Sequence, residues 1–163
     1  FMDDSNAAEL AYRMDALFYD LPATRGGAYV GKPDGVNKLH THLVAIDERL
    51  ATTPLPSQKP VTLVGLAGSV TTLSAVHQKL ARWDPAKIQG SILKTDDLEK
   101  LIPLFRQTTL DQKKTLPGMV AGREDTIRAG SLILKKVMER LGTSQVIVSD
   151  RGLRYGVVWD QVV

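Results

Sequence analysis

The 163-residue sequence contains no cysteine, and only 6% of its residues are aromatic. The absence of cysteine excludes a disulfide framework and any cysteine-ligated zinc site. No apolar run approaches the roughly 20 residues that a bilayer-spanning helix needs. The start of the chain also has no basic-then-apolar signal pattern. Together these absences favour a cytoplasmic protein with no membrane partner.

The sequence also lacks any run of charge of one sign. Its 21 Lys and Arg residues are scattered among 18 Asp and Glu residues, which leaves a net charge of +3 and a pI near 9.2. This balance suits an anionic ligand but is too weak to indicate nucleic-acid binding. We therefore expect a mixed, solvated surface and no nucleic-acid partner.

Clusters of metal-ligating or nucleophilic residues are missing as well. His40 and His42 lie two positions apart, so on a helix they point in different directions. His77 lies on an apolar helical face and is predicted to pack in the core. No zinc site and no Ser-His-Asp nucleophile is predicted. Trp83 and Trp159 have no basic surroundings and are predicted to be packing residues.

What the sequence does contain is an alternation of helical and strand patterns. Apolar residues in steps of three and four predict helices over residues 7–18, 36–50, 73–80, 95–105 and 124–141. Thr95 is the predicted N-cap of the fourth, and Gly142 is the predicted end of the fifth. Apolar, β-branched runs predict strands at 61–64 and 146–148, with a weaker one at 88–93. This alternation predicts an α/β domain with a largely parallel sheet.

Three segments carry a resemblance to a known family. They are the glycine-threonine turn after a strand at 64–73, the Leu-Pro-Gly-Met and Arg-Glu-Asp run within 116–130, and the Val-Ser-Asp-Arg-Gly-Leu-Arg run at 148–156. In this order and spacing they resemble the exopolyphosphatase / guanosine pentaphosphate phosphohydrolase (Ppx/GppA) family. The resemblance covers the chain from about residue 61 to its end.

The resemblance implies a fold, an activity and partners. It implies a ribonuclease H-like domain of the actin-like ATPase superfamily, incomplete at its N-terminal side. Family members place two such domains around a cleft that holds Mg²⁺ and the phosphate chain, and they hydrolyse a terminal phosphoanhydride of inorganic polyphosphate or pppGpp. Residues 36–163 would be the C-terminal domain, and residues 1–35 match poorly. The implied partners are the missing N-terminal domain and a second copy in a homodimer.

The sequence departs from the family where catalysis is expected. No Asp-x-Gly-Gly-Gly-Ser-Thr-Glu loop precedes residue 36, and Gln89-Gly90 replaces the usual His-Gly. The chain opens with Phe1 before Met2, which indicates a fragment or a trimmed chain. We therefore expect the catalytic residues to lie in a missing N-terminal part. We expect no metal ligand in this chain, Mg²⁺ only in the intact enzyme, and little or no hydrolysis by the chain alone.

The residues that remain are suited to bind phosphate. Gly65 and Gly68 would let the backbone approach an anion, and the following helix would direct its free N–H groups at the turn. The hydroxyls of Ser69, Thr71 and Thr72 would add hydrogen bonds. From spacing alone, a plain strand–turn–helix joint is the better explanation. The family resemblance favours the phosphate site.

Basic residues in the other two segments complete the candidate site. Arg123 matches the family's arginine and would bind phosphate through two parallel N–H groups, although a surface arginine is the plainer explanation. Asp150 is predicted to be the N-cap of a last helix. Arg151 and Arg154 in its first turn would oppose the helix dipole, which hints at an acidic ligand or a neighbouring carboxylate.

Two other functions remain open at this point. A non-catalytic module that binds pppGpp or polyphosphate, or docks a partner, would also lack the glycine-rich phosphate loop. A gene that begins near Phe1 would favour this module, and one that extends well upstream would favour the enzyme. An actin-like sugar kinase fragment is the third function, but the three segments resemble kinases less closely.

Overall fold

The computed structural model describes residues 44, 46–56 and 61–160. Residues 46–52 are helical. The elements that follow are β1 (Val64–Gly65), α3 (Ala67–His77), α4 (Pro85–Ile88), β2 (Ile92–Lys94), α5 (Thr95–Gln107), α6 (Leu110–Lys114), α7 (Ile127–Leu141), β3 (Gln145–Val148) and α8 (Leu153–Asp160). The predicted helix at 7–18, the predicted boundary at residue 35, and His40 and His42 lie outside the described residues.

The three strands of the described part form one sheet in the order β1–β3–β2. β1 and β3 are parallel, with Gly65 opposite Val148. β2 runs antiparallel to β3, with Leu93 opposite Val146, so the prediction of a largely parallel sheet is wrong for this strand. The segment after α3 returns to the carboxyl end of β3, where the Gly90 N–H donates to the Val148 carbonyl at 2.8 Å. β2 therefore starts at that end and runs back.

The weak strand predicted at 88–93 is shorter and lies later in the structure: the short helix α4 ends at Ile88, and β2 covers only Ile92–Lys94. The carboxylate of Asp84 accepts the Ala86 N–H at 3.1 Å and starts α4, with Pro85 at its first position. Pro is favoured there because its fixed φ suits the helix and its missing N–H is not needed. Ile88 at the end of α4 is fully buried and belongs to the core.

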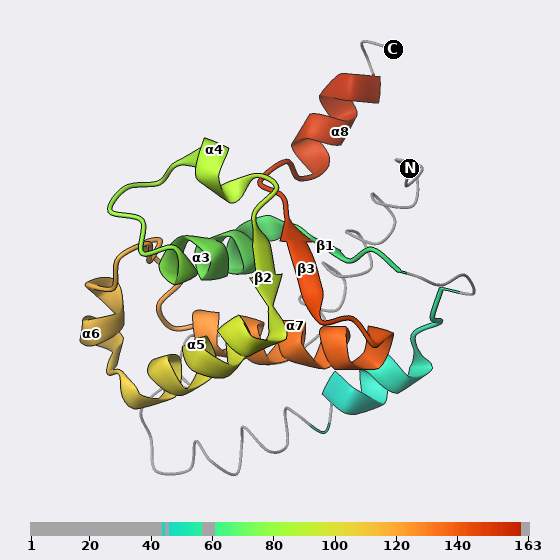
Figure 1. The fold of residues 1–163 in the computed structure, drawn as a ribbon, viewed down its shortest axis with the longest axis horizontal. Helices are drawn as coiled ribbons and strands as arrows, with labels where there is room; N and C mark the ends of the chain where they lie inside the picture. The colour runs from blue at the N-terminus through green and yellow to red at the C-terminus, as the bar shows by residue number, and fades with distance from the viewer. Residues whose placement is uncertain (1–43, 45, 57–60, 161–163) are drawn as a thin grey trace.

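Helices α3, α5 and α7 pack against one another and against the sheet (Figure 1). They enclose a core in which the largest fully buried apolar side chains are Phe105, Leu73, Ile88, Leu93, Leu98, Ile127, Met138, Val146 and Val148. Burial of each such side chain stabilises the fold by roughly 1.5–3 kcal/mol. The core therefore fixes α3 and α7, which carry the candidate site, against the sheet.

The starts of two predicted helices differ from the structure. α7 begins at Ile127 rather than at residue 124, because residues 123–126 form a turn in which Thr126 and Ile127 both donate to the Arg123 carbonyl, at 3.2 and 2.8 Å. Its end at Gly142, with φ of 67°, is confirmed. At α5 the N-cap is Lys94, not Thr95. The Lys94 N–H donates to the Asp97 carboxylate at 2.9 Å.

The sequence predicts that three side chains, one imidazole and two indoles, pack in the core. In the structure all three lie on the surface. His77 is exposed at the end of α3, with Nδ1 3.7 Å from the Asp97 carboxylate. Trp83 and Trp159 are 47% and 61% exposed. Trp159 lies on α8, which projects away from the sheet in Figure 1. The apolar pattern could not show that these elements lie at the edge of the core.

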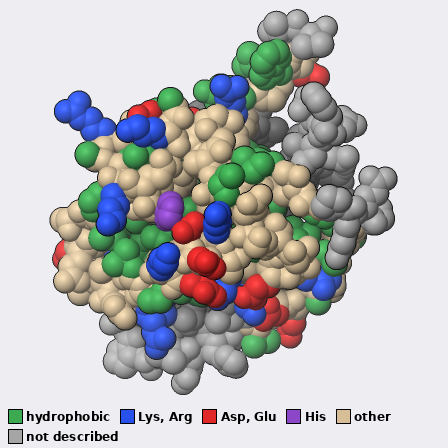
Figure 2. Space-filling view, viewed as in Figure 1, with side chains coloured by type: hydrophobic (Ala, Val, Ile, Leu, Met, Phe, Trp, Pro, Cys, Tyr) green, Lys and Arg blue, Asp and Glu red, His purple; other side chains and the backbone are tan. Residues whose placement is uncertain are grey.

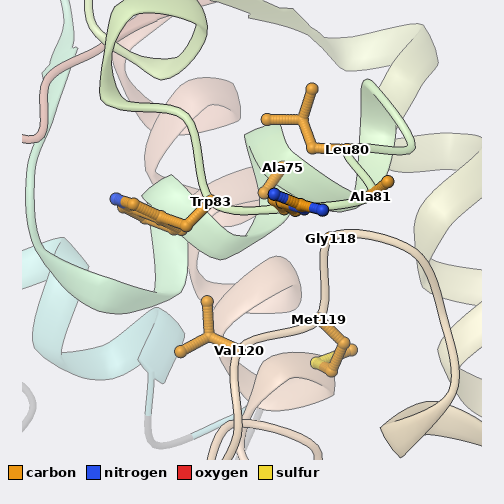
Figure 3. Close-up of a pocket in the computed structure, with 8 residues that line it drawn as sticks. Ala75, Leu80, Ala81, Trp83, Gly118, Met119 and Val120 are labelled. Carbon is orange, nitrogen blue, oxygen red and sulfur yellow. The ribbon is translucent and has the colours of Figure 1, made fainter.

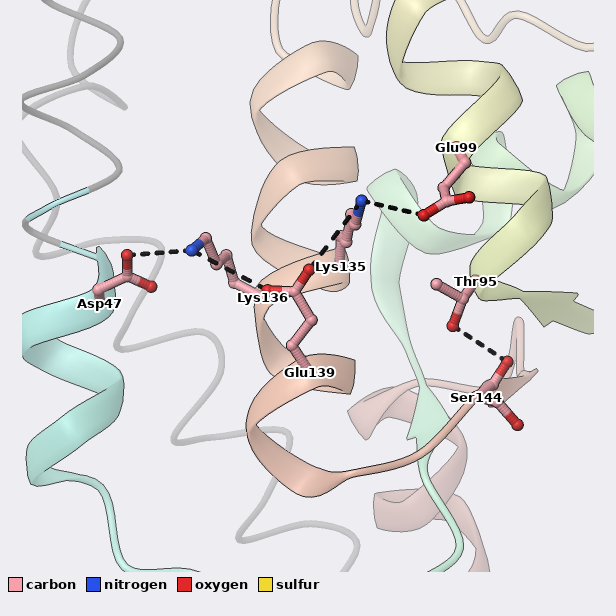
Figure 4. A network of polar contacts seen from close by, with 7 residues as sticks. All are labelled: Asp47, Thr95, Glu99, Lys135, Lys136, Glu139 and Ser144. Atoms are coloured by element: carbon pink, nitrogen blue, oxygen red, sulfur yellow. Dashed lines mark hydrogen bonds and ion pairs between the residues drawn. The ribbon is translucent and has the colours of Figure 1, made fainter.

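A polar network joins the helix at residues 46–52 to α7 and α5 (Figure 4). Lys136 of α7 contacts Asp47 at 3.1 Å, and Lys135 contacts Glu99 of α5 at 3.4 Å. Arg140 donates through Nε to the Leu50 carbonyl at 3.0 Å, which satisfies the end of the 46–52 helix. Exposed ion pairs of this kind contribute at most about 1 kcal/mol each. These contacts therefore fix the orientation of the 46–52 helix but add little to the free energy of unfolding.

The surface carries mixed charge, as the sequence predicts. On the face drawn in Figure 2, Lys and Arg side chains lie among Asp and Glu side chains and no patch of one sign dominates. Within the described residues, no helix combines the length and the apolar character needed to cross a bilayer.

Candidate phosphate-binding site

The first and third family-like segments leave the sheet side by side. β1 and β3 are parallel neighbours, so the turn that follows Gly65 and the segment that follows Val148 start from the same edge. The Ser149 N–H donates to the Gly65 carbonyl at 2.9 Å and continues the pairing past the last strand residue. In α/β folds, ligands bind outside the carboxyl ends of strands. This edge is therefore the expected place for a ligand.

The turn itself has the backbone of an anion-binding corner. Ala67 has a φ of +71°, a left-handed conformation that costs a non-glycine residue about 1 kcal/mol or more. Gly68 follows in the right-handed helix. Such a left-then-right pair turns successive N–H groups toward one point. Leu66, the N-cap, provides no side-chain acceptor, and the first turn of α3 has no acidic residue. Ala67 is exposed and Gly68 is half-buried.

Arg123 lies directly against this corner. A Cβ built on Gly68 would be 2.5 Å from Arg123 Nη2, 2.7 Å from Cζ and 2.9 Å from Nε, so only a glycine leaves room for the guanidinium. Within the described part of the chain, the Arg123 guanidinium makes no hydrogen bond or ion pair. The structure thus brings together Gly68 and Arg123, which are 55 positions apart in the sequence. Both present unused donors.

The hydroxyl groups predicted to assist are turned inward. Ser69, Thr71 and Thr72 are only 9%, 5% and 1% exposed. The Thr71 hydroxyl donates back to the Ala67 carbonyl at 3.2 Å, within its own helix. The structure therefore does not support the expectation that these hydroxyls add hydrogen bonds to an anion. Donors from the backbone of 67–69 and from Arg123 remain.

Two glycines of the second segment explain how Arg123 reaches α3. A Cβ on Gly130 of α7 would be 2.9 Å from the Ser69 Cβ, so α7 approaches the start of α3 closely only because residue 130 lacks a side chain. Gly118, with a φ of +85°, packs on the Ala75 backbone, where a Cβ would overlap the carbonyl. Gly118 and Gly130 were visible in the sequence, but their role in letting the loop and α7 pack closely on α3 was not predicted.

The residues after β3 form a second turn at the same edge. The Gln89 side-chain oxygen accepts the Ser149 hydroxyl at 2.9 Å and the Asp150 N–H at 3.0 Å, a role that sequence reasoning missed. Asp150 is not a helix N-cap, because α8 begins only at Leu153 and Gln89 already holds this turn. The Arg151 guanidinium lies 5.9 Å from the centre of the Tyr155 ring.

The structure does not unite these residues with Arg123. Asp150 forms no ion pair with Arg123 in the described part of the chain. Arg151 precedes α8 rather than lying in its first turn, so the predicted opposition to the helix dipole is wrong for it. Arg154 lies in α8, and its side chain is outside the described part. Their contribution to a phosphate site stays a prediction.

Metal binding does not fit the residues at this corner. Among the described residues, no group of three His, Asp or Glu side chains is arranged to hold a metal ion. The nearby donors are N–H groups and a guanidinium, which bind anions and repel cations. The corner therefore has the chemistry of an anion site.

A shallow depression of about 240 Å³ lies at the opposite end of α3 (Figure 3). Its lining is mostly apolar and includes Ala75, Leu80, Trp83, Gly118, Met119 and Val120. The loop that lines it continues to Arg123, whose N–H donates to the Val120 carbonyl at 3.1 Å. The depression has the wrong chemistry for a phosphate chain and is separate from the corner at Gly68.

Comparison with known proteins decides the family. Residues 33–163 match the Ppx/GppA phosphatase family. The chain therefore belongs to the Ppx/GppA phosphatase family. It is 31% identical over 131 residues to exopolyphosphatase 2 of Mycobacterium tuberculosis, a match that covers 77% of this chain and 41% of that protein. A bifunctional 3-dehydroquinate synthase/phosphatase of Fusobacterium nucleatum is 30% identical over 101 residues, 62% of this chain and 15% of that protein.

Solved Ppx/GppA structures share the fold. The Aquifex aeolicus family member superposes with a TM-score of 0.71 at 28% identity, over 82% of this chain and 43% of that one. Its type II variant gives 0.72 at 25% identity, over 94% and 47%. The expected actin-like α/β domain is confirmed. This Ppx/GppA chain spans less than half the length of these relatives.

Proposed function

We propose that this chain forms the phosphate-binding wall of a Ppx/GppA phosphatase that hydrolyses the terminal phosphoanhydride of inorganic polyphosphate or pppGpp. By itself it has little or no hydrolase activity. The observation that carries the proposal is the unpaired Arg123 guanidinium packed against Gly68 at the uncapped start of α3. Family membership supplies the reaction class.

The geometry suits the binding half of phosphoryl transfer. The transition state spreads negative charge over the phosphoryl oxygens, so catalysis depends on positioning and on neutralising that charge. The Arg123 fork would bind two oxygens of one phosphate, and the N–H groups of 67–69 would bind a third. Each hydrogen bond to a charged group contributes about 1.5–3 kcal/mol. Activation of water and the magnesium chemistry would come from the part of the longer family members that this chain does not span.

The test is a calorimetric titration of the 163-residue chain with tripolyphosphate at low ionic strength. We expect one saturable, salt-sensitive site. Arg123→Ala should abolish it, and Arg123→Lys should weaken it because a lysine cannot make the two parallel contacts. Arg82→Ala is the matched control, since Arg82 is an exposed arginine beside the depression at the other end of α3. Equal loss in both variants would reduce the effect to net charge and contradict the site.

A phosphate-release assay tests the proposal that the chain by itself has little or no hydrolase activity. With Mg²⁺ and either polyphosphate or pppGpp, the chain should release no phosphate above the buffer rate. Hydrolysis by the chain alone would show that it is catalytically complete. If the protein encoded with its natural upstream sequence binds these compounds without hydrolysing them, the family fold serves here as a binding module instead.

A further inference from the structure

The side-chain amide of Gln89 has a fixed orientation at the carboxyl edge of the sheet. Its Oε1 lies 2.9 Å from the Ser149 hydroxyl and 3.0 Å from the Asp150 backbone nitrogen. The Asp150 N–H can only donate, so the end of the amide that faces it must be the oxygen. The Ser149 hydroxyl, which accepts the Arg151 N–H at 3.2 Å, gives its own hydrogen to the same oxygen.

The backbone of Gln89 is also held from both sides. The Gln89 N–H donates to the Pro85 carbonyl at 2.8 Å at the end of α4, and the Gly90 N–H donates to the Val148 carbonyl at 2.8 Å. Gly90 has a φ of +78°, a conformation that glycine adopts without strain. Backbone and side-chain contacts together therefore fix the place and the direction of the Gln89 amide.

The nitrogen end of this amide is unused. Nε2 carries two hydrogens and makes no hydrogen bond within the described residues. Gln89 is half-buried, and Nε2 is not one of the enclosed polar atoms in the described part of the chain, so it reaches solvent. A side chain that only held the 149–151 turn would need an acceptor and no donor. Fixed, free donors at the edge where α/β folds bind ligands point to a ligand contact.

Gln89 lies across β3 from the turn that follows Gly65. Gly65 is opposite Val148 on one side of β3, and Gly90 pairs with Val148 on the other side. Neighbouring strands lie about 4.7–4.9 Å apart, so the two positions are roughly 10 Å apart along the edge. A single phosphate bound by Arg123 cannot bridge this distance, whereas a chain of several phosphates can.

The charge of the 149–151 turn explains why a neutral donor suits this position. The Asp150 carboxylate makes no hydrogen bond or ion pair among the residues that the structure describes, so its negative charge is uncompensated there. A cationic side chain at position 89 would pair with this carboxylate, and its donors would be lost to a ligand. The amide of Gln89 keeps its donors free for an incoming oxygen.

We propose that Gln89 is a ligand-binding residue: its Nε2 donates a hydrogen bond to an oxygen of the second or a later phosphate of a chain whose end is bound by Arg123. This inference rests on the proposed phosphate-binding function of the corner at Gly68. It makes the protein selective for condensed phosphates over orthophosphate.

The test is a pair of nuclear magnetic resonance titrations of the 163-residue chain, one with orthophosphate and one with tripolyphosphate. We work at 0.15 M ionic strength, where the screening length of about 8 Å weakens any effect of a distant charge. Tripolyphosphate should bind more tightly than orthophosphate. The side-chain amide signals of Gln89 should shift only with tripolyphosphate, and with the same dissociation constant as the Arg123 Nε–H signal.

Three substitutions separate the contact from its alternatives. Gln89→Met has a similar length and no donor, so it should lower tripolyphosphate affinity about 10-fold and leave orthophosphate affinity within about 2-fold. Gln89→Glu keeps the acceptor that holds the turn but replaces the donors by a negative oxygen, so tripolyphosphate affinity should fall further. Gln89→His at pH 8 offers one acceptor and one N–H donor, and should retain most of the affinity.

Gln112→Met is the matched control. Gln112 lies on the exposed surface of α6, and its Oε1 also accepts a backbone N–H, that of Thr109 at 2.8 Å. The substitution therefore removes the same kind of hydrogen bond away from the sheet edge. It should leave the affinity for both phosphates unchanged.

The outcomes are distinct from those of the parent proposal. If the wild-type chain binds neither phosphate, the phosphate-binding function and this inference both fail. If tripolyphosphate binds through Arg123 while the Gln89 amide signals stay unmoved, the function stands and the contact is refuted. Equal loss of both ligands in Gln89→Met, with both retained in Gln89→Glu, would also refute it, since Gln89 would then only hold the turn.

Discussion

Replacement of Gly68 by alanine should separate the stability of the fold from anion binding. Gly68 lies in the first turn of α3, and alanine is a better helix former than glycine by up to about 1 kcal/mol. The new Cβ would lie 2.5 Å from Arg123 Nη2. Favourable contacts between such atoms begin at about 3.5 Å, so the guanidinium must move by roughly 1 Å. It is the flexible end of an exposed side chain and moves at little cost.

The expected result is therefore two changes of opposite sign. The melting temperature should stay the same or rise by about 2–4 °C. Tripolyphosphate affinity should fall about 10- to 100-fold, because one charge-assisted contact of about 1.5–3 kcal/mol is lost or misaligned. Thermal denaturation and calorimetric titration of the same preparation measure both quantities.

Gly156→Ala is the control for helix propensity. Gly156 lies in α8, and a Cβ there meets nothing within 4 Å. It should raise stability by a similar amount and leave binding unchanged. The reasoning is refuted if Gly68→Ala keeps full affinity, since the guanidinium would then have no role at that corner.

Three further predictions concern the loop and its surroundings. Gly118→Ala should destabilise the fold by about 2–6 kcal/mol in urea denaturation, because φ is +85° and the Cβ would overlap the Ala75 carbonyl; a change below 0.5 kcal/mol would contradict the packing. Ala67→Gly should raise stability by less than about 1 kcal/mol and preserve anion affinity, since relief of the left-handed strain is partly offset by a more flexible unfolded chain. Burial lowers the pKa of Lys113 in the folded chain. The folded chain therefore binds fewer protons than the unfolded chain between that pKa and 10.5, and its free energy of unfolding should rise with pH in that window relative to Lys113→Met. Parallel pH profiles for the two proteins would contradict this.

The sequence predicted the fold well where periodicity is strong. The helix that ends at Gly142, the strand at 146–148 and the α/β class are confirmed by α7, β3 and the shared actin-like fold. It failed where tertiary geometry decides. The direction of β2 depends on where the preceding segment returns to the sheet, and the exposure of His77 depends on where α3 leaves the core.

The candidate site was predictable in its parts but not in its assembly. Gly68 and Arg123 were both identified from the family-like segments, yet only the structure shows them in contact. The inward hydroxyls of Thr71 and Thr72 could not be foreseen, because these residues, four and five positions after Ala67, turn toward the core only once α7 packs on α3. Outside the site, the full burial of Lys113 gave no signal in the sequence, since a lysine on a short polar helix is normally exposed.

The most direct test follows the corner itself by nuclear magnetic resonance while tripolyphosphate is added to the 163-residue chain. We predict that the Arg123 Nε–H signal and the backbone amides of Ala67, Gly68 and Ser69 shift together and saturate at one common dissociation constant. Shifts spread evenly over surface lysines and arginines, with these four signals unmoved, would contradict a phosphate-binding role for this part of the Ppx/GppA fold.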